Sequence, residues 1–188
     1  MSAADLCLET LPGGFNAIEC TLFLAMVTAG IQNYFEWGAG GSTLLAAKRA
    51  RSVTSVEGSR VWVDKMRNGS LPSNVNLRYV DIGPTKAFSW PVQTNTTRSR
   101  EYIRAIDAVP PQDVVLVDGR WRVACALRAR NRLTAPNGVV LVHDFDRKAY
   151  QVLLGPFREV ARKGNLVALR PREGVHHVST AYESDPSR

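Results

Sequence analysis

The chain alternates short β-rich runs with segments of helical spacing, and this alternation limits its fold more than any other feature. Each β-rich run carries Glu or Asp at or next to its end. The runs are "IQNYFEW", "SVTSVE", "VNLRYVD", "DVVLVD" and "GVVLVHD". Helical spacing is found over residues 17–29, 43–51, 60–68, 121–133 and 148–163. The alternation predicts βαβ units and a largely parallel sheet covered on both faces.

The end of the chain departs from this alternation. "GNLVALRP" and "VHHVSTAY" are separated only by the short turn "REG", with no helix between them. Two strands joined so tightly must pair antiparallel. The sequence therefore predicts a parallel α/β sheet that is finished by an antiparallel hairpin.

Length and composition fit one domain of an ordinary globular protein. The chain has 188 residues, of which 45% are apolar and 22% charged. No apolar run approaches the ~20 residues needed to cross a bilayer, and the first residues lack the pattern of a signal peptide. Cys7, Cys20 and Cys125 are odd in number and far apart. This spacing argues against a disulfide framework and a zinc site, so we expect a cytoplasmic protein.

The formal charge of +7 raises the question of a nucleic-acid partner. The basic residues are, however, spread along the chain. Arg128, Arg130 and Arg132, for example, cannot share one helical face. A solvated surface or an anionic small substrate explains the charge better than nucleic acid does.

Three glycines in "YFEWGAGGSTLL" indicate a close approach to the backbone. The dinucleotide fingerprint G-x-G-x-x-G is incomplete, because Gly38 and Gly40 are followed by Thr43 where a third glycine is required. The Walker A lysine is absent as well. Glu36, ahead of the turn, is poorly placed for pyrophosphate and well suited to a cation.

Two further strand ends extend this pattern. Glu57 closes the next strand, 21 residues after Glu36, where an acid accepts hydrogen bonds from ribose hydroxyls. Asp81 closes the third strand, where it would meet a nucleobase edge. The three acids together describe a nucleoside with a positively charged tail, which S-adenosylmethionine is. Taken singly, each acid is equally well explained as a cap of the following helix.

These residues resemble the class I S-adenosylmethionine-dependent methyltransferases over about residues 33–182. "FEWGAGGST" resembles their first motif, "SVTSVEGS" the second, and "YVDIG" and "VVLVDG" the third and fourth. The resemblance implies a Rossmann-like three-layer α/β/α fold with a seven-stranded, mainly parallel sheet that ends in an antiparallel hairpin. It also implies a cofactor site formed by Glu36, Gly38, Gly40, Ser42, Glu57, Asp81 and Asp118.

The fourth and fifth strands are expected to face the transferred methyl group. "VDGRW" lacks the (D/N)-P-P-(Y/F) motif of enzymes that methylate amino groups of nucleobases or glutamine. Together with "GVVLVHDFDRKAY" it resembles, more locally, the glucuronoxylan O-methyltransferase-like proteins. We therefore predict O-methylation of a small or carbohydrate-like acceptor, and the charge of the chain is compatible with an anionic one.

His143 is the first candidate for the base that deprotonates this acceptor, because imidazole titrates near neutral pH. A satisfied core histidine is the alternative. Asp118 and Asp144 are further candidates, either as bases or as a pair that holds a divalent ion. Catechol O-methyltransferase-like enzymes place metal-binding carboxylates at these strand ends, but there Asn follows the second acid, whereas Phe145 follows here. We predict no metal, with Asp118 and Asp144 as the candidate ligands if one binds.

Residues 84–111 are expected to form a lid or binding element, because they make a long polar loop with an exposed Trp90. We predict that Trp90 and Arg120 bind the acceptor, Arg120 through its guanidinium fork. His176 and His177 are adjacent on a presumed strand, so we interpret them as structural. The expected organisation is one domain. It has an N-terminal helix at about 15–30, a cofactor half at about 31–83, the loop at about 84–111 and a substrate half at about 112–188.

Two other functions compete with this one. The first is a catalytically inactive methyltransferase-like module that binds a nucleoside or a protein partner. The second is a nicotinamide-dependent oxidoreductase, which the missing third glycine and the absence of Tyr-x-x-x-Lys disfavour. The sequence does not indicate an oligomeric state.

Overall fold

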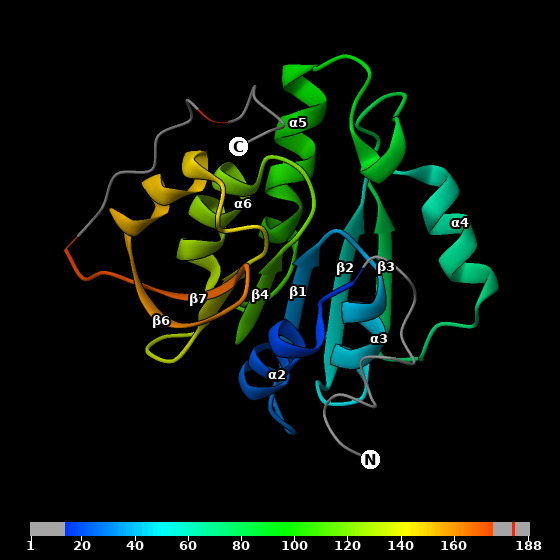
Figure 1. Cartoon of the computed structure of the whole chain (residues 1–188). Coiled ribbons are helices and arrows are strands. Elements are labelled where there is room, and N and C mark those ends of the chain that lie inside the picture. Colours follow the sequence, from blue (N-terminus) through cyan, green and yellow to red (C-terminus); the bar gives the residue numbers. More distant parts are fainter. Residues whose placement is uncertain (1–13, 175–181, 183–188) are drawn as a thin grey trace.

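The computed structural model describes residues 14–174 and 182, and its centre is one seven-stranded sheet (Figure 1). The strand order is β3-β2-β1-β4-β5-β7-β6, with β1 to β5 parallel and β7 antiparallel to both β5 and β6. The strands are β1 (Asn33–Trp37), β2 (Ser52–Glu57), β3 (Val75–Tyr79), β4 (Val114–Val117), β5 (Val139–Val142), β6 (Phe157–Lys163) and β7 (Leu166–Pro171). The predicted Rossmann-like architecture is confirmed.

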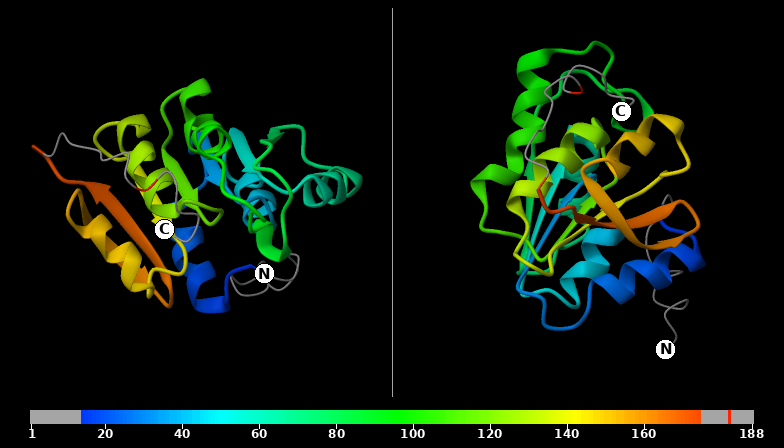
Figure 2. Two further views of the ribbon diagram at one scale, coloured as in Figure 1. Left: turned by 90° about the horizontal axis from the view of Figure 1, so that it is seen from above. Right: turned by 90° about the vertical axis from the view of Figure 1, so that its left-hand side faces the viewer.

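Helices cover both faces of the sheet (Figure 2). The α-helices are α2 (Ala17–Met26), α3 (Gly41–Ala47), α4 (Arg60–Asn68), α5 (Thr96–Ile103) and α6 (Arg122–Ala129). Four 3₁₀ segments follow the same chain order: η1 (Ala87–Ser89), η2 (Arg104–Ala108), η3 (Arg130–Arg132) and η4 (Lys148–Leu154). Each of the first five predicted strands overlaps an observed one.

Two apolar cores form because successive side chains of a strand point to opposite faces. Phe35 and Trp37 of β1 are buried with residues of α5 and α6 on one face. Tyr34, between them in sequence, is buried with residues of α2 and α3 on the other. Strand β1 therefore packs against apolar residues on both faces, as expected for a strand in a covered sheet.

The prediction of one helix over residues 148–163 is wrong in its second half. Tyr150 and Leu153 are buried in η4, as the helical spacing indicates. Gly155 and Pro156 then end the helical segment, and β6 follows as an antiparallel partner of β7. The hairpin partner of "GNLVALRP" thus precedes it, whereas "VHHVSTAY" with His176 and His177 lies outside the described residues except for Tyr182.

The cysteines also differ from expectation. Cys20 in α2 is disulfide-bonded, whereas Cys125 is free and buried. The argument against paired cysteines fails because distance along the chain does not fix distance in the fold. The cytoplasmic location, which rested partly on it, stays a prediction. Over residues 14–174 and 182, no helix has the length and apolar character needed to span a membrane.

Candidate functional site

The glycine loop between β1 and α3 contains two glycines with different structural roles. Gly38 has a φ of +92°, and a Cβ placed there would lie 2.8 Å from the backbone nitrogen of Gly119. Its lack of a side chain thus serves close packing within the protein. A Cβ on Gly40 would meet no atom of residues 14–174 or 182 within 4 Å. The open space beside the loop is therefore at Gly40, and this is where a ligand has room to approach the backbone.

Glu36 lies beneath this loop and has no exposed surface. Its carboxylate accepts hydrogen bonds from the hydroxyls of Tyr34 (2.8 Å), Ser42 (2.7 Å), Thr43 and Ser55. Burial raises the pKa of Glu36, and these four hydroxyl donors partly offset the rise. Glu36 therefore holds the start of α3 in place through these hydroxyl groups, and its predicted contact with a cation stays a prediction.

Glu57 ends β2 as predicted, and its carboxylate is almost fully buried. It accepts hydrogen bonds from the backbone N–H groups of Ala39 (3.3 Å) and Ser59 (2.8 Å). A third hydrogen bond, of 2.6 Å, comes from the hydroxyl of Ser89. Burial raises the pKa of Glu57 and these donors lower it, with a net rise. Glu57 is thus an acceptor of hydroxyl hydrogen bonds at a strand end, the chemistry expected of a ribose ligand.

Asp81 lies at the surface beyond β3. It pairs with Arg98 at 3.3 Å and accepts hydrogen bonds from the Gly83 backbone (2.8 Å) and the Tyr79 hydroxyl (3.1 Å). The bond from Gly83 contributes most to lowering the pKa of Asp81. These contacts do not connect Asp81 to Glu57 or Asp118. Its predicted contact with a nucleobase stays a prediction.

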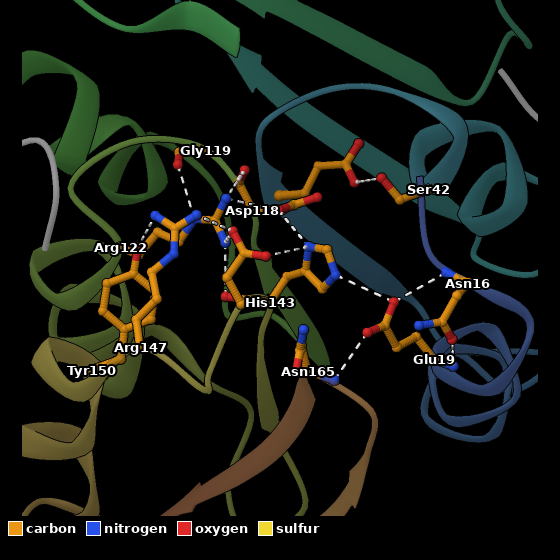
Figure 3. Close-up of polar contacts among 12 residues, drawn as sticks. Asn16, Glu19, Ser42, Asp118, Gly119, Arg122, His143, Arg147, Tyr150 and Asn165 are labelled. Carbon is orange, nitrogen blue, oxygen red and sulfur yellow. Dashed lines mark hydrogen bonds and ion pairs between the residues drawn. The ribbon is translucent and has the colours of Figure 1, made fainter. Parts of the chain in front are cut away.

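Arg122 organises the ends of β4 and β5 (Figure 3). Its guanidinium lies 3.0 Å from Asp118 Oδ1 and 2.9 Å from Asp144 Oδ2, and it also donates to the carbonyls of Asp118, Gly119 and His143. Burial lowers the pKa of Arg122, but Asp118 and Asp144 raise it above its ordinary value. The two acids that the sequence placed at neighbouring strand ends are therefore joined by one buried cation.

His143 lies between two carboxylates (Figure 3). Its Nδ1 is 3.0 Å from Asp118 Oδ1, and its Nε2 is 3.3 Å from Glu19 Oε2. Burial lowers the pKa of His143, but the hydrogen bond and charge of Asp118, with a contribution from Asp144, raise it above its ordinary value. The two carboxylates, one near each ring nitrogen, therefore favour the protonated form of His143.

Glu19 is a site residue that the sequence analysis did not identify. It lies in the first turn of α2 and is buried, where it also accepts hydrogen bonds from the backbone N–H groups of Asn16 (3.0 Å) and Asn165 (2.9 Å). The pattern Asn16-x-x-Glu19 is a capping box, which predicts a helix start. No sequence signal links it to His143, 124 residues further along the chain.

Arg120 is buried beside this cluster, with a side chain that makes no ion pair within the described residues. Only 6% of the residue is exposed, and its Nε has no hydrogen-bond partner there. Its guanidinium carbon lies 4.8 Å from the ring centroid of Trp90, a cation–π contact. Burial is the largest cause of the lowered pKa of Arg120. Arg120 is therefore a positive group with no anionic partner among the residues that the structure describes.

The loop that carries Trp90 folds back on itself over these groups. The Lys86 N–H donates to the Trp90 carbonyl (2.7 Å) and the Val92 N–H to that of Pro84 (2.8 Å). Phe88 and Ser89 have φ values of +57° and +56°, a region that costs free energy for residues other than glycine. Trp90 is half-buried against Arg120, whereas the sequence indicated an exposed side chain. The single segment 84–92 therefore contacts both the predicted cofactor acid and the predicted acceptor-binding cation.

The donor set at Asp118 and Asp144 does not fit a divalent metal ion. Arg122 occupies the position between the two carboxylates, and Arg147 binds Asp144 at 2.7 Å. Among residues 14–174 and 182, no group of three potential ligands has metal-binding geometry. Guanidinium groups compensate the charge that a metal ion would compensate in such a pair.

Comparison with known proteins identifies the fold in which these residues lie. No protein-family model and no curated protein matches the chain. A crystal structure of a methyltransferase-like protein from Silicibacter pomeroyi matches it with a TM-score of 0.78 and 27% identity, over 94% of this chain and 96% of the other. The chain has the fold of the class I S-adenosylmethionine-dependent methyltransferases. This confirms the resemblance inferred from the four strand-end motifs.

Two more distant structures share the methyltransferase fold. Precorrin 8W decarboxylase of Methanobacterium thermoautotrophicum has a TM-score of 0.56 and 19% identity, over 90% of this chain and 97% of its own. The N-methyltransferase NodS of Bradyrhizobium japonicum has a TM-score of 0.53 and 15% identity, over 81% of this chain and 94% of its own. Because their reactions differ, the fold leaves the acceptor to be argued from the site.

Proposed function

We propose that this protein transfers the methyl group of S-adenosylmethionine to an oxygen atom of a small, anionic acceptor. The observation that carries the cofactor assignment is Glu57, a buried carboxylate at the end of β2 that accepts a hydroxyl hydrogen bond. A ribose hydroxyl would take the place of the Ser89 hydroxyl there. The open space at Gly40 gives the cofactor room beside the loop.

The remaining cofactor residues divide into contacting and positioning groups. Ser42, at the start of α3, donates its hydroxyl to Glu36, so we assign both to holding the loop that carries Gly40. Gly38 holds the same loop against β4 by close packing. Asp118 remains the candidate for contact with the cationic tail of the cofactor, because its side chain is partly exposed at a position next to the glycine loop. Asp81 remains the candidate for contact with the nucleobase.

S-adenosylmethionine supplies an electrophilic methyl group, and placement of the acceptor oxygen against it accounts for much of the acceleration. We assign placement to Arg120, whose guanidinium would bind a carboxylate or phosphate of the acceptor beside the Trp90 ring. A carbohydrate acid is one acceptor of this kind. The burial of Arg120, with no anionic partner among the described residues, supports this assignment.

The proton of an acceptor hydroxyl would pass to Asp118 rather than to His143. Both ring nitrogens of His143 face carboxylates, Asp118 at Nδ1 and Glu19 at Nε2, so we assign His143 to orienting Asp118. Burial raises the pKa of Asp118, but Arg122 and His143 lower it below its ordinary value. Such a weak base suits an acidic hydroxyl or an acceptor that is already ionised. Asp144, paired with Arg122 and Arg147, positions Arg122.

Calorimetry with S-adenosylmethionine and S-adenosylhomocysteine tests the cofactor assignment. Glu57→Gln should weaken binding at least tenfold, because the amide loses the charge that accepts hydroxyl hydrogen bonds, whereas Glu101→Gln on the exposed side of α5 should not. The absence of binding to the unaltered protein would refute the assignment. So would equal affinity of the Glu57→Gln variant.

A second candidate function is a methyltransferase-like module without activity. The observation in its favour is that Ser89 and Trp90 lie against Glu57 and Arg120, so the chain itself covers the site. This function predicts cofactor binding with no S-adenosylhomocysteine formed across a panel of hydroxylated carboxylic and phosphorylated acceptors. Turnover with any of them, lost in Arg120→Gln, would establish the enzyme.

A further inference from the structure

A groove at the other end of the sheet gathers four arginines. It has a volume of about 910 Å³ and lies between residues 133–138, the start of β6 and the end of β7. Because β7 runs antiparallel to β5, the end of β7 lies beside the start of β5, away from Asp118 and His143. The charged residues lining this arginine groove are Arg130, Arg158, Arg170, Arg172 and Glu173.

Two of these arginines directly oppose each other across neighbouring strands. Arg158 of β6 and Arg170 of β7 are register partners, so both side chains lie on the same face. Like charges in this position destabilise a sheet. Neither has an acidic partner within the described residues, and Arg170 Nε is buried without a hydrogen-bond partner. Another arginine of β6, Arg162, does form an ion pair with Glu159 of that strand. Arg158, on the same strand, differs from Arg162 in this respect.

The other two arginines are held by backbone carbonyls. Arg130 Nη2 donates to the Arg172 carbonyl at 2.6 Å. Arg172 Nε donates to the carbonyls of Phe157 (2.9 Å) and Leu154 (3.3 Å). These bonds fix the positions of two guanidinium groups without neutralising them. Two of the four positive charges of the groove are thus held in place, and among its described lining residues Glu173 is the one acid.

We propose that the arginine groove binds a small ligand with a di- or triphosphate group. Guanidinium forks match phosphate oxygens, and a multiply charged anion would compensate the opposed pair Arg158 and Arg170 at once. The volume is that of a small-molecule site. A nucleic acid would require a basic stripe that continues beyond the groove. This site is separate from the methyl-transfer site and does not depend on the proposed function.

Calorimetry with pyrophosphate and tripolyphosphate at low ionic strength tests the proposal. The double variant Arg158→Gln/Arg170→Gln should lose at least tenfold in affinity. A matched control, Lys48→Gln/Arg51→Gln, removes two positive charges at exposed positions elsewhere and should bind as the unaltered protein does. Both anions should also raise the melting temperature of the unaltered protein and of the control, but not that of the groove variant.

Several outcomes would overturn the proposal. One is no binding by the unaltered protein, and another is an equal loss in the groove variant and the charge-matched control. Citrate binding as tightly as tripolyphosphate would refute the phosphate assignment. A single-stranded RNA that binds more tightly than tripolyphosphate, and loses that affinity in the groove variant, would replace the small ligand by nucleic acid. S-adenosylmethionine binding should be the same in all three proteins, which separates this test from that of the methyl-transfer site.

Discussion

The two ends of the sheet use arginine in opposite ways. At the carboxyl ends of β4 and β5, Arg122 is buried between two carboxylates and its charge is balanced within the protein. At the other end, Arg158 and Arg170 face each other, and neither has an acidic partner among the residues that the structure describes. A balanced charge supports the architecture, whereas an unbalanced, fixed charge is available to a ligand. Arg120 lies beside Arg122 but resembles the groove arginines, because it too has no acidic partner among the described residues.

The largest effect is expected at Arg122. Arg122→Met leaves Asp118 and Asp144 without their shared cation and should lower the free energy of unfolding by about 3–5 kcal/mol. Arg162→Met, which removes an exposed pair with Glu159, should cost less than about 1 kcal/mol. Urea denaturation of both variants measures the difference. Equal losses of stability in the two variants would show that the buried Arg122 cluster contributes no more than an exposed ion pair.

The glycine loop gives the next largest effect. Gly38→Ala should cost on the order of 2 kcal/mol, because its φ is positive and the new Cβ would press on the Gly119 backbone. Gly40→Ala should change stability by less than about 0.5 kcal/mol, since the space there is open. Thermal denaturation gives both values. A Gly40→Ala variant that is as unstable as Gly38→Ala would contradict the assignment of open space.

The His143 cluster predicts a dependence of stability on pH. The pKa of His143 is raised in the folded protein, because the hydrogen bond and charge of Asp118 outweigh burial. The folded state then binds the proton more tightly than the unfolded chain. The stabilisation is therefore complete below about pH 6.5 and is lost as the pH rises through the folded pKa. Urea denaturation from pH 6 to 9 should show this loss in the unaltered protein and not in His143→Gln.

A smaller effect is expected at Ser89. Its hydroxyl donates a hydrogen bond to the Glu57 carboxylate, so a ribose hydroxyl that binds Glu57 must replace this bond. Ser89→Ala should tighten S-adenosylmethionine binding by about two- to tenfold, the equivalent of one modest hydrogen bond. Calorimetry beside Ser70→Ala, another positive-φ serine, separates this effect from a general loosening of the backbone. Unchanged or weaker binding would show that Ser89 does not compete.

The smallest expected effect is a gain in stability. Arg170→Gln should raise the free energy of unfolding by about 0.2–1 kcal/mol at low ionic strength, because it relieves repulsion from Arg158. The gain should shrink with added salt as the charges are screened. Thermal denaturation at two salt concentrations provides the comparison. A loss of stability would mean that the Arg170 side chain is balanced internally.

Most of the regular structure followed from local pattern. The predicted ranges of β2 and α4 coincide with the observed ones, because apolar alternation, helical spacing and strand-end acids are properties of neighbouring residues. The exception is Phe157–Lys163, where apolar residues at helical spacing form β6. Its strand state depends on pairing with β7, a long-range preference that local spacing does not record.

Local sequence patterns predicted the first five strands and the helices between them, the acids at the strand ends and the glycines between β1 and α3. Which groups meet became known from the three-dimensional structure: Glu19 with His143, Ser89 with Glu57, and Arg158 with Arg170. The physical reason is that backbone conformation responds to nearby residues, whereas ionic and hydrogen-bonded contacts depend on register and on packing between segments far apart in the chain. The type of a residue determines which groups it can bind, and the fold determines whether such a group is already provided by the protein.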